Sequence, residues 1–289
     1  FFFTINYADC QYYVVSSSEN LLYKLDISEK EPFLSLGEIN DSEDSQINGF
    51  NGLTQNPIDG KVYVVYHSMQ SGPRFLATLD IENYELSTIG PLIDKIANIS
   101  FDNEGVLYGI SGDGGPTPNR LYEIDYESAD MTTLTDLSSY PDDDGEAICY
   151  NSIDGYMYRM AGGAFLYKID LNTFEQFLVT DMLSDDGTCG HALSHNSELD
   201  QFITLATYQC TMTSSGVQDC FEFFEIPPCV KGVLPVSEIS SSLQTLSNLD
   251  YKRCVKVLDA LGREVNQATN QILFHIYDDG SVKKKFIVD

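Results

Sequence analysis

Short apolar runs alternate with clusters of Gly, Asp, Asn and Pro along the first 236 residues. The clearest unit is segment 56–66, in which Asn-Pro-Ile-Asp-Gly-Lys leads into Val-Tyr-Val-Val-Tyr. Val and Tyr suit the pleated surface of a strand, and Gly supplies the positive φ that a tight hairpin turn needs. The pattern therefore predicts two antiparallel strands joined by a turn at Asp59-Gly60.

This hairpin recurs along the chain. The positions that align with Gly60 each follow an acidic residue, and they are Cys10, Gly105, Gly155 and Gln201. Three positions beyond the turn come Tyr13, Tyr63, Tyr108, Tyr158 and Thr204. The repeats are spaced by 45 to 50 residues.

A second marker stays in phase with the first. The motif Leu-Tyr-Lys-Leu-Asp at 22–26 returns at 76–80, 121–125 and 166–170, and more loosely at 223–227. Several short strands repeated at this period are typical of propeller blades. The sequence thus predicts an all-β fold, a five-bladed β-propeller over residues 1–236. Six blades are the alternative, if 230–250 and an upstream segment build another.

Each blade is expected to contain four strands. In the first blade we expect strands at 2–7, 11–16, 21–26 and 33–38. The fifth blade is expected to begin at 190–193, to continue through 201–208 and 221–226, and to end with an outer strand at 232–236. The repeat resembles the secreted blades of the NHL and quinoprotein-like kind. The chain has no Trp, so the marks of WD-type blades are absent. This resemblance implies an architecture and no particular function.

After the propeller, residues 237–250 form a mostly polar linker, and 251–289 are expected to form a small β domain. A strand, a turn at Gly262, a second strand, an Asp279-Gly280 hairpin and a last strand follow in order. Alternation places Val282, Lys284, Phe286 and Val288 on one face of the last strand, which should pack inward with Ile272, Phe274 and Ile276.

The last 40 residues resemble the C-terminal sorting domain of the type 9 (Por) secretion system of Bacteroidetes-type bacteria. The residues that carry the resemblance, beside Leu258-Asp259, are Leu261, Gly262, Arg263, Glu264, Tyr277, Asp279, Gly280, Lys283, Lys284 and Lys285. The resemblance implies export across the outer membrane by the type 9 machinery, and a secreted or outer cell-surface location. His275 replaces the usual Gly before Tyr277, and the domain is short, so the manner of attachment stays open.

The net charge of the chain limits the classes of molecule that it can bind. Asp and Glu number 44 against 16 Lys and Arg, which gives a net charge of −28. Such a surface repels nucleic acids and anionic lipid headgroups, and it suits multivalent cations or plain solubility. No apolar run is long enough to span a membrane as a helix. The chain starts at Phe1 without Met, as expected of a processed or trimmed product.

Seven cysteines are too few for a disulfide-built scaffold, and none forms a Cys-x-x-Cys pair. Cys210 and Cys220 flank a polar loop between two expected strands, so we predict a disulfide across it and an oxidising compartment. Cys10 and Cys229 are a second pair, if the first and last blades meet. Cys149 is expected to be a buried thiol.

Acidic loops precede several blades and suggest a cation site. The candidate ligands are Asp113, Asp142, Asp143, Asp144, Asp185 and Asp186. Clustered carboxylates on Gly-permitted turns suit Ca²⁺, which takes six to eight oxygens. A solvated acidic rim explains the same residues, because Asp-Gly is also ordinary turn chemistry.

Candidate catalytic groups are sparse. No nucleophile elbow, Walker loop or zinc-protease motif occurs, and His191 and His195 are too far apart along one strand to chelate a single ion. The sequence therefore favours a binding or assembly protein whose ligand is an extracellular polymer, a protein or further copies of itself. The alternative is an extracellular polysaccharide hydrolase or lyase that uses two acids of the rim.

Overall fold

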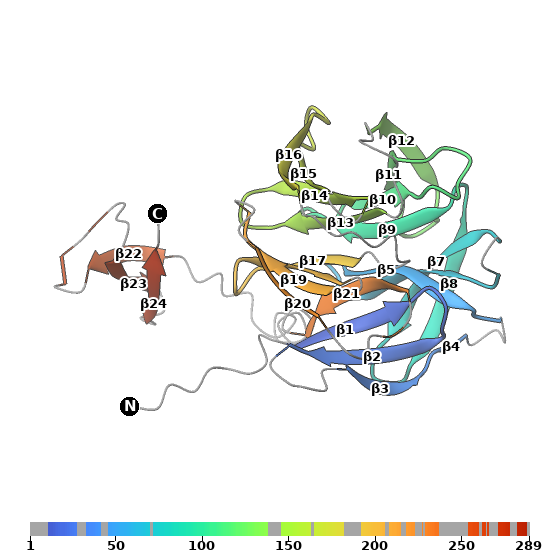
Figure 1. The fold of residues 1–289 in the computed structure, drawn as a ribbon, viewed down its shortest axis with the longest axis horizontal. Coiled ribbons are helices and arrows are strands. Elements are labelled where there is room, and N and C mark those ends of the chain that lie inside the picture. Colours follow the sequence, from blue (N-terminus) through green and yellow to red (C-terminus); the bar gives the residue numbers. More distant parts are fainter. Residues whose placement is uncertain are drawn as a thin grey trace. The chain divides into compact units, whose positions relative to one another are not determined.

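A computed structural model gives the fold (Figure 1). The structure describes residues 11–27, 33–41, 46–69, 72–137, 146–162, 165–181, 192–205, 208–214, 218–222, 227, 229–236, 254–259, 262–263, 265, 271–277 and 282–287. The chain divides into two compact units, Phe1–Leu243 and Gln244–Asp289.

The first unit is a five-bladed β-propeller, as the repeats predicted. In order from the innermost strand outward, blade one holds β21 (Val230–Pro235), β1 (Gln11–Ser16), β2 (Leu21–Asp26) and β3 (Phe33–Glu38). Blade two holds β5 (Gly49–Gln55), β6 (Val62–His67), β7 (Arg74–Asp80), β8 (Glu85–Leu92) and the short parallel β4 (Asn40–Asp41). Blade three holds β9 (Ile96–Phe101), β10 (Leu107–Ser111), β11 (Arg120–Ile124) and β12 (Met131–Asp136).

Blades four and five complete the ring. Blade four holds β13 (Glu146–Asn151), β14 (Tyr156–Ala161), β15 (Phe165–Ile169) and β16 (Gln176–Asp181). Blade five holds β17 (Ala192–Asn196), β18 (Gln201–Leu205), β19 (Tyr208–Met212) and β20 (Gln218–Glu222). The five innermost strands contact one another in the order β21, β5, β9, β13, β17 and back to β21. They therefore enclose a central channel.

The core lies between the blades. Five clusters of buried apolar side chains each join two neighbouring blades, and together they cover all five junctions of the ring. At the junction of blades two and three, the rings of Tyr63 and Phe101 pack edge to face at 5.2 Å. At the junction of blades four and five, Tyr158 and Phe202 pack at 4.4 Å. The recurrent Tyr of the hairpin is thus a packing residue.

Ring closure differs from the sequence-based expectation. Segment 232–236 was expected as the outer strand of blade five, yet β21 pairs with β1 as the innermost strand of blade one, with Val233 opposite Val14. The outer strand of blade five is β20 instead. Residues 2–7, expected to form the innermost strand of blade one, lie outside the described residues. Blade one therefore takes strands from both ends of the propeller sequence, which locks the ring without a free inner edge.

The recurring hairpin has a common physical basis. Gly60, Gly105 and Gly155 have φ between 72° and 83°, the left-handed region that Gly enters without a steric penalty. In blade five the equivalent residue is Asp200, with φ of 52°, since Asn196 pairs with Gln201 across the turn. The expected alignment with Gln201 and Thr204 was therefore wrong by one residue in this blade.

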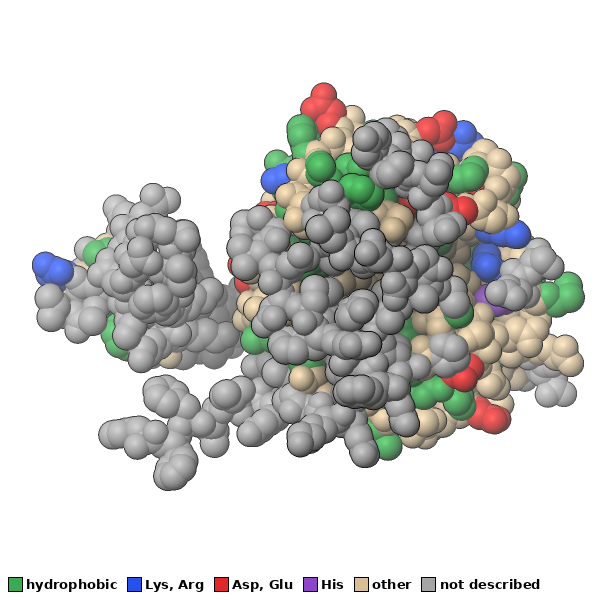
Figure 2. Space-filling view, viewed as in Figure 1, with side chains coloured by type: hydrophobic (Ala, Val, Ile, Leu, Met, Phe, Trp, Pro, Cys, Tyr) green, Lys and Arg blue, Asp and Glu red, His purple; other side chains and the backbone are tan. Residues whose placement is uncertain are grey.

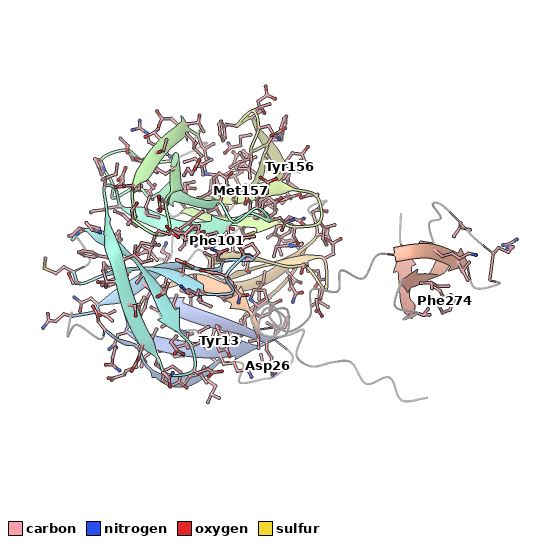
Figure 3. All side chains as sticks on the ribbon, turned by 180° about the vertical axis from the view of Figure 1, so that it is seen from behind. Tyr13, Asp26, Phe101, Tyr156, Met157 and Phe274 are labelled. Carbon is pink, nitrogen blue, oxygen red and sulfur yellow. The ribbon has the colours of Figure 1, made fainter. Side chains whose placement is uncertain are left out.

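The second repeated motif, Leu-Tyr-Lys-Leu-Asp at 22–26 and its equivalents, recurs because its Leu is buried and its Asp caps the next turn. Its Leu is fully buried in four blades, and a β-bulge follows it in each of them. Its Asp accepts hydrogen bonds from backbone N–H groups of the next turn, as Asp125 Oδ1 does from Glu127 at 2.8 Å and Ser128 at 3.1 Å. This side-chain acceptor fixes the turn to the outer strand. Figure 3 labels the corresponding acid of blade one, Asp26, whose Oδ2 accepts a hydrogen bond from Gln11 Nε2 at 2.8 Å.

The inner strands approach one another closely. A Cβ at Gly232 of β21 would lie 2.8 Å from Leu53 Cβ and 2.9 Å from its backbone nitrogen. A Cβ at Gly52 would lie 2.8 Å from the backbone nitrogen of Ile99. These two positions require Gly because neighbouring backbones fill the space of a side chain.

The second unit contains a three-stranded antiparallel sheet of β22 (Cys254–Asp259), β23 (Gln271–Tyr277) and β24 (Val282–Ile287). The register places Val282 opposite Ile276 and Lys284 opposite Phe274, so these residues share a face as expected. Val282 is 56% exposed, however, because it begins an edge strand, so its expected inward packing was wrong.

Several residues of the proposed sorting signal lie in this sheet. Gly262 has φ of 77° and forms the predicted turn, and Arg263 beside it is exposed. Tyr277 ends β23, and Lys283, Lys284 and Lys285 lie within β24. Leu261, Glu264, Asp279 and Gly280 lie outside the described residues. In the described part of the chain, no helix is long and apolar enough to cross a membrane.

Candidate functional site

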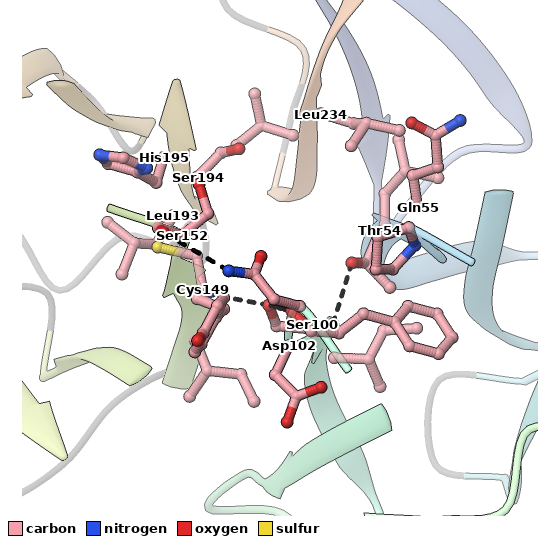
Figure 4. Close-up of a pocket in the computed structure, with 18 residues that line it drawn as sticks. Thr54, Gln55, Ser100, Asp102, Cys149, Ser152, Leu193, Ser194, His195 and Leu234 are labelled. Carbon is pink, nitrogen blue, oxygen red and sulfur yellow. Dashed lines mark hydrogen bonds between the residues drawn. The ribbon is translucent and has the colours of Figure 1, made fainter. Parts of the chain in front are cut away.

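A cavity of about 180 Å³ occupies one end of the central channel (Figure 4). Residues of all five innermost strands line it, together with residues of the turns that follow β5, β9 and β13. We call these turns and the equivalent turn after β17, residues 56–61, 102–106, 151–156 and 196–201, the mouth of the cavity. The mouth therefore lies at the opposite end of the inner strands from the described loop between β8 and β9, which carries Asp94.

One equivalent position in each inner strand builds the cavity wall. These residues are Thr54, Ser100, Cys149, Ser194 and Leu234, and they oppose corresponding residues of the neighbouring strand in the register of each blade. The wall thus combines three hydroxyl groups, one buried reduced thiol and one aliphatic side chain. Figure 4 shows all five side chains around the cavity.

Two of the hydroxyl groups also join neighbouring blades. Thr54 Oγ1 accepts a hydrogen bond from the backbone N–H of Phe101 at 3.3 Å. Ser100 Oγ accepts one from Tyr150 at 2.9 Å. The Ser100 hydroxyl also donates to the Phe101 carbonyl at 3.3 Å. A hydroxyl oxygen has two lone pairs, so each of these two oxygens holds the ring together and keeps one acceptor site. The wall is therefore preorganised.

Asp102 lies at the inner side of the mouth and is only 9% exposed. Its Oδ1 accepts hydrogen bonds from the backbone N–H groups of Glu104 and Val106, both at 2.9 Å, and its Oδ2 accepts one from the Tyr108 hydroxyl at 3.3 Å. The equivalent residues of the other described turns are Asn56, Asn151 and Asn196, which cap their turns in the same way. Blade three alone among these four turns places a carboxylate there.

His195 contributes a buried imidazole to the cavity lining. Its Nε2 lies 3.4 Å from Asp200 Oδ1, and its ring packs against Phe202 at 4.7 Å. Burial lowers the pKa of His195, and the Asp200 carboxylate opposes that shift. His195 is thus a buried residue of β17 (Ala192–Asn196) that is held by packing.

Exposed apolar side chains surround the mouth. Ile58 is 64% exposed, Ile153 55% and Leu199 38%, and all three lie in the same kind of turn on three different blades. The turns also touch one another, because Asn103 Nδ2 donates to the Ser152 carbonyl at 3.4 Å. These three side chains lie singly on separate turns, where each can contact a molecule bound at the cavity.

None of the predicted calcium ligands lines this cavity within the described residues. Asp113 is exposed in the loop between β10 and β11, at the other end of the channel. Asp142, Asp143, Asp144, Asp185 and Asp186 lie outside the described residues. Within the described ranges, no three His, Cys, Asp or Glu residues are grouped as a metal site.

Asp94, another acid of the expected rim, is buried and structural. Its Oδ2 accepts hydrogen bonds from the Tyr122 hydroxyl at 2.8 Å and from Thr117, and its Oδ1 accepts one from the Lys95 backbone at 2.7 Å. A Cβ at Gly115 would lie 2.5 Å from the same carboxylate. The Gly-rich loop therefore folds over Asp94.

A buried ion pair stabilises blade four. Arg159 and Glu146 have side chains with 0% exposure, and the guanidinium donates to both carboxylate oxygens at 2.7 and 2.8 Å. Gln176 and Asn119 accept further hydrogen bonds from the guanidinium at 2.8 and 3.1 Å. Sequence analysis missed this pair, because nothing in the strand pattern distinguishes it from exposed charges.

The strand register is compatible with the predicted disulfide between Cys210 and Cys220. Cys210 and Cys220 are directly opposite in the β19–β20 ladder, so their backbones are registered for a cross-strand bridge. Bond formation itself stays a prediction. Cys10, the expected partner of Cys229, lies outside the described residues.

No family model and no curated protein matches the chain. Solved structures that are similar to this chain include a chain of the nidogen–laminin complex, at 10% identity and a TM-score of 0.49, over 96% of this chain and 89% of that one. TolB from Acinetobacter baumannii is 10% identical with a TM-score of 0.46, over 95% of this chain and 62% of its own length. Virginiamycin B lyase from Staphylococcus aureus, solved with quinupristin, is 10% identical with a TM-score of 0.42, over 93% and 74%. Similarity at this identity concerns the fold alone.

Proposed function

We propose that the protein is a secreted or cell-surface binding and assembly protein whose propeller captures a ligand at the mouth. The observation that carries this proposal is the set of exposed apolar residues, Ile58, Ile153 and Leu199, at matching turns around a preorganised cavity. Exposed apolar surface around a concave site marks contact with another molecule. The ligand class includes extracellular proteins and polymers.

The buried polar groups support a scaffold role. The carboxylates of Asp94 and Glu146 are each held by several internal hydrogen bonds, which fix loops and blades in place. Rigid positioning of this kind reduces the entropy lost when a ligand binds. The propeller is thus suited to present a fixed surface.

For delivery, we propose that the second unit acts as a type 9 sorting signal. The division of the chain after Leu243 supports this role, because a signal must be handled separately from the cargo. The Lys-rich strand β24 and the Gly262 turn are the parts of the signal within the described residues. Deleting residues 244–289 should abolish export and leave a folded propeller inside the cell. Unimpaired export of the truncated chain would contradict the sorting role.

Binding is tested with the purified full chain and a triple variant, Ile58→Ser, Ile153→Ser and Leu199→Ser. Both proteins are applied to a panel of immobilised extracellular polysaccharides and proteins, and the polysaccharides are also assayed for new reducing ends or unsaturated sugars. We expect the parent to bind a panel member and the triple variant to lose that binding. Release of sugar products by both proteins would instead favour the alternative, a hydrolase or lyase at the acidic rim.

A further inference from the structure

We propose that the mouth binds a basic polypeptide segment, and that one Lys or Arg side chain of this segment enters the cavity. This inference rests on the proposed function and names its partner. It is carried by three properties of the same site: charge around the mouth, a buried carboxylate behind it, and the composition of the cavity wall.

The mouth is strongly acidic. Its acidic side chains, in addition to Asp102, are Asp59, Glu104, Asp154, Glu198 and Asp200. Within the four turns the one cationic residue is Lys61, whose Nζ lies 3.9 Å from Asp59. Beside the mouth, Lys168 Nζ lies over the Tyr156 ring at 4.0 Å. The excess of carboxylates attracts a cationic partner and repels an acidic one. Acidic side chains are also visible at separate places on the face drawn in Figure 2.

Asp102 extends this negative charge to the cavity. Within the described residues its hydrogen-bond partners are two backbone N–H groups and a Tyr hydroxyl, and no cation forms an ion pair with it. A buried carboxylate whose hydrogen-bond partners are neutral interacts strongly with an incoming cation, because the surrounding dielectric is low. The other described turns are capped by a neutral Asn at this position. Capping the turn therefore does not require the negative charge of Asp102.

The cavity wall matches an amphipathic cationic side chain. Leu193, Ile148 and Leu234 line the cavity but are each at most 3% exposed, so they offer only a small apolar contact to an aliphatic stem. The hydroxyl oxygens of Ser100 and Ser194 offer acceptors to a head group that only donates hydrogen bonds, as Lys and Arg do. A cavity of about 150 Å³ holds a benzene molecule. The 180 Å³ here is therefore sufficient for one long side chain.

The exposed apolar residues then contact the rest of the segment. Ile58 lies against the neighbouring turn, since a Cβ added at Gly105 would be 2.6 Å from its Cγ1. Ile58, Ile153 and Leu199 thus form apolar points on three blades. Aliphatic residues between the basic residues of the partner would cover these points and remove apolar area from water.

The test uses the full chain and a fluorescein-labelled peptide of alternating Lys, Leu and Arg residues, with fluorescence anisotropy as the readout. The comparison peptide has Glu in place of each Lys and Arg. We expect the basic peptide to bind with an affinity that falls as salt rises, and the acidic peptide not to bind. Equal binding of the two peptides would overturn the inference.

Matched variants separate this site from the general negative charge. Asp102→Asn keeps the turn cap in the form that the other blades use and removes one charge, so it should weaken binding about tenfold. Asp113→Asn makes the same change in an exposed loop at the other end of the channel and should leave binding unchanged. Ser194→Leu places in blade five the residue that blade one has, fills the cavity and should also weaken binding. Equal effects of Asp102→Asn and Asp113→Asn would overturn the inference.

The outcomes distinguish this inference from the proposed function. The triple variant of Ile58, Ile153 and Leu199 could fail to bind a ligand that the parent binds independently of salt and of Asp102. In that case the mouth is the binding surface, and the inference of a basic partner is wrong. If the triple variant binds every ligand as the parent does, the mouth is not the binding surface and both proposals fail.

Discussion

Val233 lies directly opposite Val14, although 218 positions separate them in the sequence, and this pairing closes the propeller. Both side chains are at most 3% exposed. The strand that carries Val233 comes from the end of the propeller sequence and supplies the innermost position of the first blade. The stability of the whole ring therefore depends on β21.

The first prediction concerns this closure. A chain that ends at residue 243 should fold and melt cooperatively, whereas a chain that ends at residue 229 should not fold. The shorter chain loses the buried Val230, Val233 and Leu234, each worth about 1.5–3 kcal/mol. That sum is comparable to the whole stability of a typical domain. Circular dichroism melting of the two truncated chains provides the measurement, and a cooperative transition in the shorter one would contradict the closure.

The second prediction concerns the buried ion pair. Glu146→Gln leaves the Arg159 guanidinium buried without its counter-charge, so we expect a loss of about 3–5 kcal/mol in the free energy of unfolding. The double variant Glu146→Gln with Arg159→Met should lose less, because no charge is left unpaired. Urea unfolding of both variants and the parent checks this. A double variant no more stable than the single one would show that the pair is not coupled.

The third prediction concerns pH. Burial and the nearby Arg74 charge lower the pKa of His67 to about 4. In the unfolded chain the pKa of a histidine is near 6.5. Between pH 6.5 and pH 4 the histidine is therefore protonated in the unfolded state and neutral in the folded state. Stability should therefore fall in that window.

His67→Asn removes the titrating group behind this effect. The variant should lose about 2.5 kcal/mol less stability than the parent between pH 7 and pH 4.5, as measured by urea unfolding at both pH values. Identical pH dependence in parent and variant would show that His67 is not the group responsible.

The fourth prediction concerns the cysteines. Cys210 and Cys220 are opposite in the β19–β20 ladder, and a disulfide there would stabilise the fold by about 2–3 kcal/mol through loop closure. Labelling with a thiol reagent under denaturing, non-reducing conditions, followed by peptide mass analysis, should modify Cys149 and leave this pair unmodified. Cys149 serves as the internal control, since it is a reduced thiol. Labelling of both Cys210 and Cys220 would exclude the bridge.

The repeats made the blade number predictable because their physical causes are local. A Gly or Asp at positive φ, a Tyr against the next blade and an Asp cap on the outer turn all act within one blade. The pairing of β21 with β1 was not predictable in this way. It depends on which strand meets the first blade when the ring closes, and the local pattern of 230–235 suits an inner and an outer strand equally.

The candidate site was harder to predict for a similar reason. The cavity is built by one residue from each of five distant strands, and only the fold brings Thr54, Ser194 and Leu234 together. A signal for the mouth was nevertheless present. Ile58 and Ile153 precede the acidic residue of the recurrent turn, and Leu199 takes the place of that acidic residue in blade five, and all three are exposed.

The central claim, that the mouth is the binding surface, is tested most directly by amide hydrogen exchange of the full chain with and without the basic peptide. Bound peptide should slow exchange in the turns at 56–61, 102–106, 151–156 and 196–201, because it covers their N–H groups, and should leave the loop at 111–120 unchanged. Protection confined to 111–120 and the other loops at that end of the channel would contradict the account and assign binding to the acidic rim.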